Sequence, residues 1–117
     1  MIKNKSGVWG EVYAARYLRD NGYSILSSNY SCRFGEIDLI ASKKKTICFI
    51  EVKARNKSTD IRPMEAVDEG KQRRVMLTAQ NYIAYSKLKG EMRFDVCEVY
   101  LNDDDTLEKI NYIKNAF

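Results

Sequence analysis

The sequence predicts an α/β domain, in which a mixed central sheet of about five strands is flanked by helices. Segments with helical periodicity alternate with short apolar runs of strand character, in the order helix, three strands, long helix, one or two strands. A length of 117 residues suits one domain with one hydrophobic core. One proline and six glycines leave no long flexible linker, so residues 1–117 are expected to fold as one unit.

The first element is a helix over about residues 7–21. Ser6 is placed to cap its N-terminus, and Asn21 with Gly22 is placed to end it. Glu11 falls on the core-facing stripe of this helix, which is an unusual place for an acid. The simpler alternative is a partly exposed carboxylate near the helix N-terminus, where the helix dipole favours negative charge.

A strand over residues 23–30 and a short connection lead into a hairpin. Its two apolar runs, residues 37–41 and 47–52, are rich in Ile, Val and Phe and flank a lysine-rich turn at residues 43–45. Short apolar runs of this kind, bounded by polar residues, are typical of paired strands.

Three charged residues interrupt this apolar hairpin. Asp38 lies in the first run, and Glu51 and Lys53 lie at the end of the second. Alternate strand residues share a face, so Glu51 and Lys53 point the same way as Phe49. A strand that is apolar on both faces is usually buried on both, where a charge is costly unless it is paired or holds a metal. Functional residues are therefore expected here first.

The second half of the chain predicts a loop, a long helix and two strands. Residues 55–62 form the polar loop, and Pro63 suits the first turn of a helix over residues 63–88. The predicted core stripe of this helix consists of Val67, Lys71, Val75, Thr78, Tyr82 and Tyr85. Residues 92–101 and 107–113 alternate as antiparallel strands, and the third strand, long helix and fourth strand suit a right-handed parallel crossover.

The composition excludes several classes of site. The sequence contains no histidine, which removes His-based general bases, catalytic triads and most zinc sites. Cys32, Cys48 and Cys97 show no CxxC spacing, so we interpret them as reduced thiols in a cytoplasmic protein. There is no signal peptide and no apolar stretch of membrane-spanning length. The net charge of +4 is compatible with an anionic partner.

The charged residues of the hairpin suit metal-assisted hydrolysis of a phosphodiester. Asp38 and Glu51, on neighbouring strands, can converge on one hard cation such as Mg²⁺ or Mn²⁺, with the Val52 carbonyl as a further ligand and Glu11 as an upstream candidate. Lys53 can orient the attacking water or stabilise charge on the phosphate. The alternative is a structural Glu51–Lys53 ion pair, because such networks also place charges in buried surroundings.

Further residues are candidates for supporting this site. Glu36 shares strand parity with Asp38 and is either a partner behind the metal ligands or an exposed residue at the strand start. Contacts to nucleic-acid phosphates, which would be salt-dependent, are expected from two groups of residues. They are Arg55, Lys57 and Arg62 on the polar loop and Lys71, Gln72 and Arg74 at the start of the long helix.

Several ordered motifs resemble the YraN-like family of uncharacterised bacterial proteins, and the resemblance spans nearly the whole chain. The stretches that carry it are Gly10-Glu11, Ala14-Ala15, Tyr17-Leu18, Gly35-Glu36-Ile37-Asp38-Leu39-Ile40-Ala41, Phe49-Ile50-Glu51-Val52-Lys53-Ala54-Arg55, Lys71-Gln72-Arg73-Arg74, Arg93-Phe94-Asp95-Val96 and Asn115-Ala116-Phe117. That family in turn resembles archaeal Holliday-junction resolvases and restriction-endonuclease-like nucleases with the PD-(D/E)xK motif.

The resemblance implies a restriction-endonuclease-like fold and Mg²⁺-dependent nuclease chemistry. Position by position, it assigns the helix acid to Glu11, the metal aspartate to Asp38, the second acid to Glu51 and the catalytic lysine to Lys53. The proline of the motif is absent, because Ile37 precedes Asp38.

The implied activity is that of an endonuclease on DNA, including branched or structured DNA, and the sequence does not separate DNA from RNA. The similar resolvases act as dimers, because cutting two strands symmetrically needs two sites, so a two-fold homodimer is expected. The rival interpretations are a non-catalytic nucleic-acid-binding adaptor with the same fold and a structural protein whose acids form only ion pairs.

Overall fold

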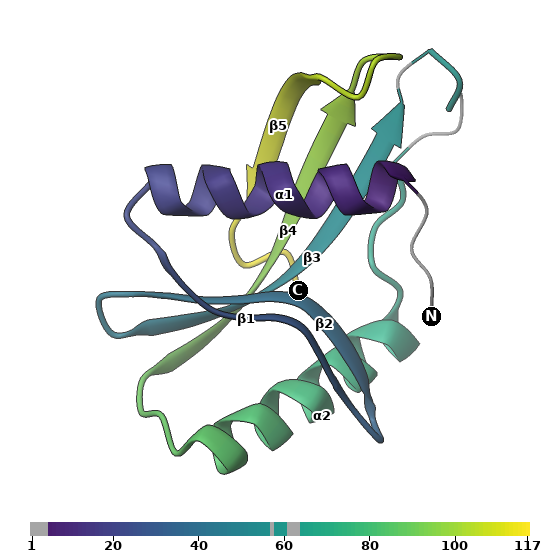
Figure 1. Ribbon diagram of the computed structural model, residues 1–117. Helices are drawn as coiled ribbons and strands as arrows, with labels where there is room; N and C mark the ends of the chain where they lie inside the picture. The colour runs from purple at the N-terminus through teal and green to yellow at the C-terminus, as the bar shows by residue number, and fades with distance from the viewer. Residues whose placement is uncertain (1–4, 57, 61–63) are drawn as a thin grey trace.

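A five-stranded mixed sheet with one helix on each face makes up the fold (Figure 1). The computed structural model describes residues 5–56, 58–60 and 64–117. The elements in chain order are α1 (Lys5–Asp20), β1 (Ser24–Cys32), β2 (Gly35–Lys43), β3 (Thr46–Asn56), α2 (Glu69–Ser86), β4 (Glu91–Leu101) and β5 (Leu107–Ile113).

The strands follow the order β1-β2-β3-β4-β5. Strands β3 and β4 are parallel and are joined through α2, whereas the other neighbours pair antiparallel. This confirms the predicted α/β class, the mixed sheet of about five strands with flanking helices, and the parallel crossover. It is the arrangement expected of the restriction-endonuclease-like fold.

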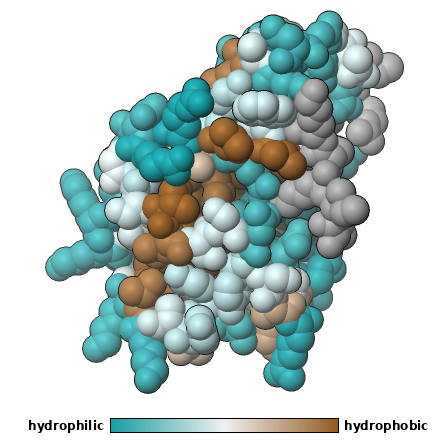
Figure 2. All heavy atoms as spheres, viewed as in Figure 1, coloured by the Kyte–Doolittle hydropathy of each residue, from teal (hydrophilic) through white to brown (hydrophobic). Residues whose placement is uncertain are grey.

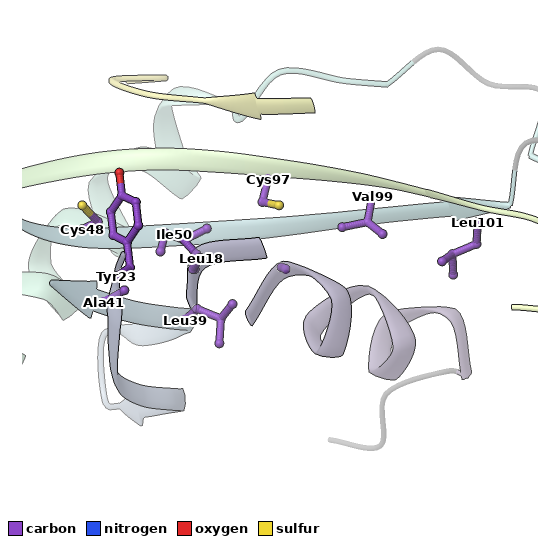
Figure 3. Close-up of a cluster of buried hydrophobic side chains, with 10 residues drawn as sticks. Leu18, Tyr23, Leu39, Ala41, Cys48, Ile50, Cys97, Val99 and Leu101 are labelled. Carbon is purple, nitrogen blue, oxygen red and sulfur yellow. The ribbon is translucent and has the colours of Figure 1, made fainter. Parts of the chain in front are cut away.

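Two hydrophobic cores lie on opposite faces of the sheet. Beneath α1, Leu18 packs with Cys48 and Ile50 of β3 and with residues of the neighbouring strands (Figure 3). Beneath α2, Phe49 packs with Ile47, Ile40 of β2 and Tyr82 of the helix. The predicted alternation along β3 is therefore confirmed, and its central residues are buried on both faces.

Burial also explains the protonation state of the Cys48 and Cys97 thiols. All three cysteines are free, and burial raises the pKa of Cys48 to about 11 and of Cys97 to about 12. These two thiols remain protonated and act as small core residues.

The helix α1 ends as predicted but begins earlier. Its last turn closes through bonds from the Tyr23 N–H to the Leu18 carbonyl (2.9 Å) and from the Gly22 N–H to the Arg19 carbonyl (3.1 Å). Gly22 has a φ of 86°, which a glycine adopts without strain, and this is a Schellman ending. The prediction that Ser6 caps the N-terminus is wrong, because the helix already includes Lys5.

The helix α2 begins later than predicted, at Glu69 instead of residue 63. Asp68 is the N-cap, since its side chain accepts a bond from the Lys71 N–H (2.8 Å). Pro63 lies outside the described residues. Of the predicted stripe, Val75, Thr78 and Tyr82 are buried, whereas Tyr85 in the last turn is 78% exposed.

Large apolar side chains remain partly exposed on the outer surface of α1. None of the helices in the described part of the chain is long and apolar enough to cross a membrane. Figure 2 shows apolar side chains gathered amid polar ones on the face that carries α1. The large apolar residues of α1 that remain partly exposed are Val8, Trp9 and Val12.

A buried carboxylate ties the end of the chain to the sheet. Asp95 of β4 is fully buried. The Arg93 Nε and Nη2 atoms donate to its Oδ1 and Oδ2 atoms, each at 2.9 Å. It also accepts bonds from the Tyr112 hydroxyl (2.6 Å) and the Asn115 N–H (3.1 Å). The Arg93 guanidinium donates further to the Tyr23 hydroxyl (2.8 Å). The hydrogen bonds that Arg93 donates to Asp95 raise the pKa of Arg93. Burial, together with the same carboxylate, raises the pKa of Tyr112, so both groups stay protonated.

Gly10 marks the closest approach of α1 to the sheet. A Cβ atom at this position would lie only 2.5 Å from the Ala54 Cβ and 3.5 Å from the Val52 Cγ1. Any side chain here would push α1 away from the half of β3 that carries Glu51 and Lys53. The glycine is therefore required by packing rather than by backbone conformation.

Replacing Gly10 with alanine is expected to lower the free energy of unfolding by about 1–3 kcal/mol, although alanine is the better helix former. Chemical denaturation followed by circular dichroism measures this. Gly70→Ala in α2 is the matched control, because a Cβ there meets only side-chain ends, and we expect a change below about 1 kcal/mol. Equal stability of the Gly10→Ala variant and the wild type would contradict the packing argument.

Candidate active site

The strand pairing between β2 and β3 ends next to Asp38, the predicted metal aspartate. Paired residues run from Lys43 and Thr46 to Leu39 and Ile50. Beyond this point the Val52 N–H donates to the Asp38 Oδ2 atom at 2.8 Å, so a side chain takes the place of the next strand partner. The separation of the two strands makes room for a carboxylate between them.

The same position changes the direction of β2. Ile37 packs into the core beneath α2, whereas Leu39, only two residues on, packs into the core beneath α1. Regular strand alternation would put both on one face. Asp38 therefore sits at a bend in β2, with its carboxylate oriented by the main chain of β3.

Glu51 lies beside Asp38 and faces α2. Its side chain is 13% exposed, and the Lys71 ammonium of α2 donates a hydrogen bond to its Oε1 atom. Burial, followed by repulsion from Asp38, raises the pKa of Glu51, while the nearby charges of Lys71 and Lys53 act against this rise. Two carboxylates thus share a partly desolvated site that lysines neutralise.

Glu51 and Lys71 line a cleft of about 390 Å³. Glu51 and Lys53 form its floor on β3, Lys71 borders it from α2, and the segment before α2 contributes Glu65 and Val67. Because Lys53 follows Glu51 by two residues on one strand, both side chains face the cleft, as the sequence predicted.

Glu11 approaches from a different direction. It is half-buried on α1, next to Gly10 at the crossing over Val52 and Ala54. Within the described residues, no three Asp, Glu or Cys side chains come close enough together to form a metal-binding group. The structure therefore brings together the Asp38–Glu51 pair, and the role of Glu11 stays a prediction, as does that of the Val52 carbonyl.

The residues predicted to contact phosphates lie in different surroundings. The Arg55 guanidinium is held by the Asp60 carboxylate at 3.0 Å, and the Gln72 Nε2 atom donates to the Val67 carbonyl at 2.8 Å. Gln72 thus fastens the segment before α2, a role that its sequence position did not indicate. Lys57 and Arg62 lie outside the described residues.

A second cleft of about 340 Å³ adjoins the first. Arg74 and the exposed Glu36 line it, and Lys71 borders both clefts. Glu36 therefore lines a different cleft from Glu51, and Lys71 borders both.

Sequence reasoning missed the ion pair between Lys71 and Glu51. It placed Lys71 on the core-facing stripe of the long helix and Glu51 on the inner strand, but it assigned the lysine to phosphate binding. The sequence signal that could have revealed this ion pair was a charged residue on an otherwise apolar helix stripe, facing a strand with an embedded acid.

The donor atoms fit a hard divalent cation. Asp38 and Glu51 supply carboxylate oxygens, the ligands that Mg²⁺ and Mn²⁺ prefer. Their mutual repulsion and partial burial favour a cation between them. The Lys71 ammonium already provides a positive charge at Glu51, which shows that the site accepts one.

Comparisons with known proteins give a consistent assignment. The model of "Uncharacterised protein family UPF0102", which is the YraN family, matches residues 10–99. A UPF0102 protein of Caldanaerobacter subterraneus subsp. tengcongensis is 50% identical, over 98% of this chain and 96% of its own length. UPF0102 proteins of Clostridium beijerinckii and Caldicellulosiruptor saccharolyticus are 43% and 42% identical, over 99% and 100% of this chain and 95% and 100% of their own lengths.

The matched region contains the whole of the β2–β3 hairpin and the start of α2, and therefore all four residues of the site, Asp38, Glu51, Lys53 and Lys71. On this evidence the chain belongs to the uncharacterised protein family UPF0102.

Proposed function

We propose that the protein is a metal-dependent endonuclease that hydrolyses phosphodiester bonds in DNA, with branched or otherwise structured DNA as the expected substrate. The observation that carries this proposal is the pair of adjacent carboxylates, Asp38 and Glu51, of which Glu51 lines an open cleft together with Lys53 on the same strand face. A purely structural ion pair would need one carboxylate for one lysine and would gain nothing from a second, repelling acid.

Each side chain has a defined task in this reaction. The Val52 N–H fixes the Asp38 carboxylate, so the ligand is oriented before the substrate arrives. Asp38 and Glu51 would hold a divalent cation, which would supply a lowered pKa for water and offset charge on the phosphate. Lys53 presents its ammonium to the same cleft, where it stabilises the negative charge that builds up on the phosphate.

The surroundings of the site suit a polyanion. Lys53 and Lys71 border the first cleft, and Arg74 extends the positive charge into the second. DNA affinity that depends on such contacts falls steeply with salt concentration. Cutting both strands of a structured DNA requires two sites, and a two-fold homodimer would supply them.

The test is a cleavage assay with linear, single-stranded, flapped and four-way DNA, each with Mg²⁺, Mn²⁺ or EDTA. We expect cleavage with a divalent ion, none with EDTA, and none by the Glu51→Ala variant. Cleavage that persists in Glu51→Ala would contradict the site assignment. Parallel assays on RNA of the same shapes decide between the two nucleic acids.

The ion pair between Lys71 and Glu51 favours a second candidate, an adaptor that binds nucleic acid without cutting it. In this case Lys71 permanently satisfies Glu51, and no metal is required. Gel-shift binding to one of the same DNA substrates, without cleavage under any metal, would support the adaptor. Absence of binding, cleavage and metal affinity would leave only a structural role for these acids.

A further inference from the structure

We infer that Lys71 is the resident counter-cation of the Asp38–Glu51 pair and that a divalent ion binds by displacing it from Glu51. This inference rests on the proposed function, since it assumes that the carboxylate pair takes up a metal ion. It assigns Lys71 a role in the metal-free protein that differs from a permanent phosphate contact or a permanent structural ion pair.

The need for a counter-cation follows from the surroundings of Glu51. Its side chain is only 13% exposed, and the Asp38 carboxylate is close enough to repel it. Two neighbouring carboxylates in a partly desolvated site are unstable unless a positive charge compensates them. The Lys71 ammonium supplies this charge through its bond to Glu51 Oε1.

Lys71 has a fixed main chain and a flexible side chain, so its ammonium can give up its place at Glu51 to a metal ion. Its main chain is fixed, because its N–H donates to the capping Asp68 side chain at the start of α2. Its side chain is 42% exposed and ends in a flexible stem. Only side-chain rotations are needed to take the ammonium off Glu51, so neither α2 nor β3 has to move.

The position of Lys71 also indicates where its ammonium would lie after it leaves Glu51. The residue borders both the cleft that contains Glu51 and the adjoining cleft lined by Glu36 and Arg74. An ammonium that leaves Glu51 therefore stays at the junction of the two clefts, beside Arg74. Uptake of a metal ion would thus release a second cation where an incoming phosphate can meet it.

A competing role makes the opposite prediction. If Lys71 served to hold Glu51 in position for the metal, removing its charge would loosen this ligand and weaken metal binding. If Lys71 competes with the metal, removing its charge strengthens metal binding. The sign of the effect on affinity separates the two roles without any measurement of cleavage.

The test is calorimetric titration of the full-length protein with Mn²⁺ in the absence of DNA, for the wild type and the Lys71→Met variant. Methionine keeps an unbranched stem of similar length but carries no charge. We expect Mn²⁺ to bind Lys71→Met about tenfold more tightly, which corresponds to about 1.4 kcal/mol. In EDTA the variant is expected to melt at a lower temperature than the wild type, and Mn²⁺ is expected to raise its melting temperature by more.

Arg73→Met is the matched control, because Arg73 is exposed on the same helix and the variant loses the same charge. Its Mn²⁺ affinity is expected to stay within about twofold of the wild type, since exposed charges are well screened. If the Mn²⁺ affinity rose equally in both variants, the effect would be due to net charge alone and the inference would be overturned. Unchanged or weaker affinity in Lys71→Met would overturn it as well.

A third variant separates failure of this inference from failure of the proposed function. If the wild type binds Mn²⁺ and Glu51→Ala does not, the metal site stands whatever the result for Lys71→Met. If Mn²⁺ binds to neither the wild type nor Lys71→Met, both the metal site and the inference fall. Binding to Lys71→Met alone would support the inference directly.

Discussion

Replacing Asp95 with alanine is expected to lower the free energy of unfolding by about 3–5 kcal/mol, which is the usual cost of removing one partner from a buried ion pair. Asp95 is fully buried and accepts bonds from Arg93, Tyr112 and Asn115. Its loss would leave the partly buried Arg93 guanidinium without its carboxylate and would remove one of the bonds that hold the residues after β5 to the sheet.

Urea denaturation followed by circular dichroism measures this change. Glu91→Ala, at an exposed position on the same strand, is the matched control, and we expect it to stay within about 0.5 kcal/mol of the wild type. Tyr112→Phe removes one bond and is expected to cost about 1–3 kcal/mol. A loss of less than about 1 kcal/mol in Asp95→Ala would show that the network contributes little to stability.

Replacing Asp38 with asparagine is expected to reduce DNA cleavage about a thousandfold. The substitution removes one of the two charged ligands proposed for the metal, and a loss of about 4 kcal/mol of transition-state stabilisation corresponds to this factor. The fold should not suffer, because the asparagine oxygen can still accept the bond from the Val52 N–H. Relief of the repulsion with Glu51 should leave stability unchanged or raise it by less than about 1 kcal/mol.

Single-turnover cleavage with Mg²⁺ and urea denaturation test the two halves of this prediction. Glu36→Gln is the comparison variant, since this acid lies two residues earlier on β2 but lines the second cleft. We expect its cleavage rate to stay within about tenfold of the wild type. A larger loss in Glu36→Gln than in Asp38→Asn would mean that the wrong acid of β2 was assigned to the metal.

The predictions that succeeded depended on local patterns. Alternation along β3 correctly placed Glu51 and Lys53 on one face because the side-chain period of a strand is fixed by its backbone. Periodicity also located both helices, but it misjudged where each one begins. A helix start depends on which side chain caps it, and for α2 this is Asp68, which the apolar periodicity does not indicate.

The features that escaped prediction depended on contacts between distant residues. The bond from Arg93 to Tyr23 joins positions 70 residues apart, and the ion pair between Lys71 and Glu51 joins two elements across the sheet face. Likewise, the bend at Asp38 arises where β2 separates from β3. Periodicity within one segment carries no information on which other segment will lie against it.

The change in burial along β3 has a consequence for how the protein tolerates variation. Residues Ile47, Cys48, Phe49 and Ile50 are buried, while those from Glu51 to Asn56 are only partly covered. One half of the strand is held by both cores, whereas the other half contributes only Val52 and Ala54, which pack against the core beneath α1. Side chains on the face of Glu51 and Lys53 can therefore be exchanged with less risk of unfolding than those packed against a core, so one scaffold can carry different reactions through local sequence change.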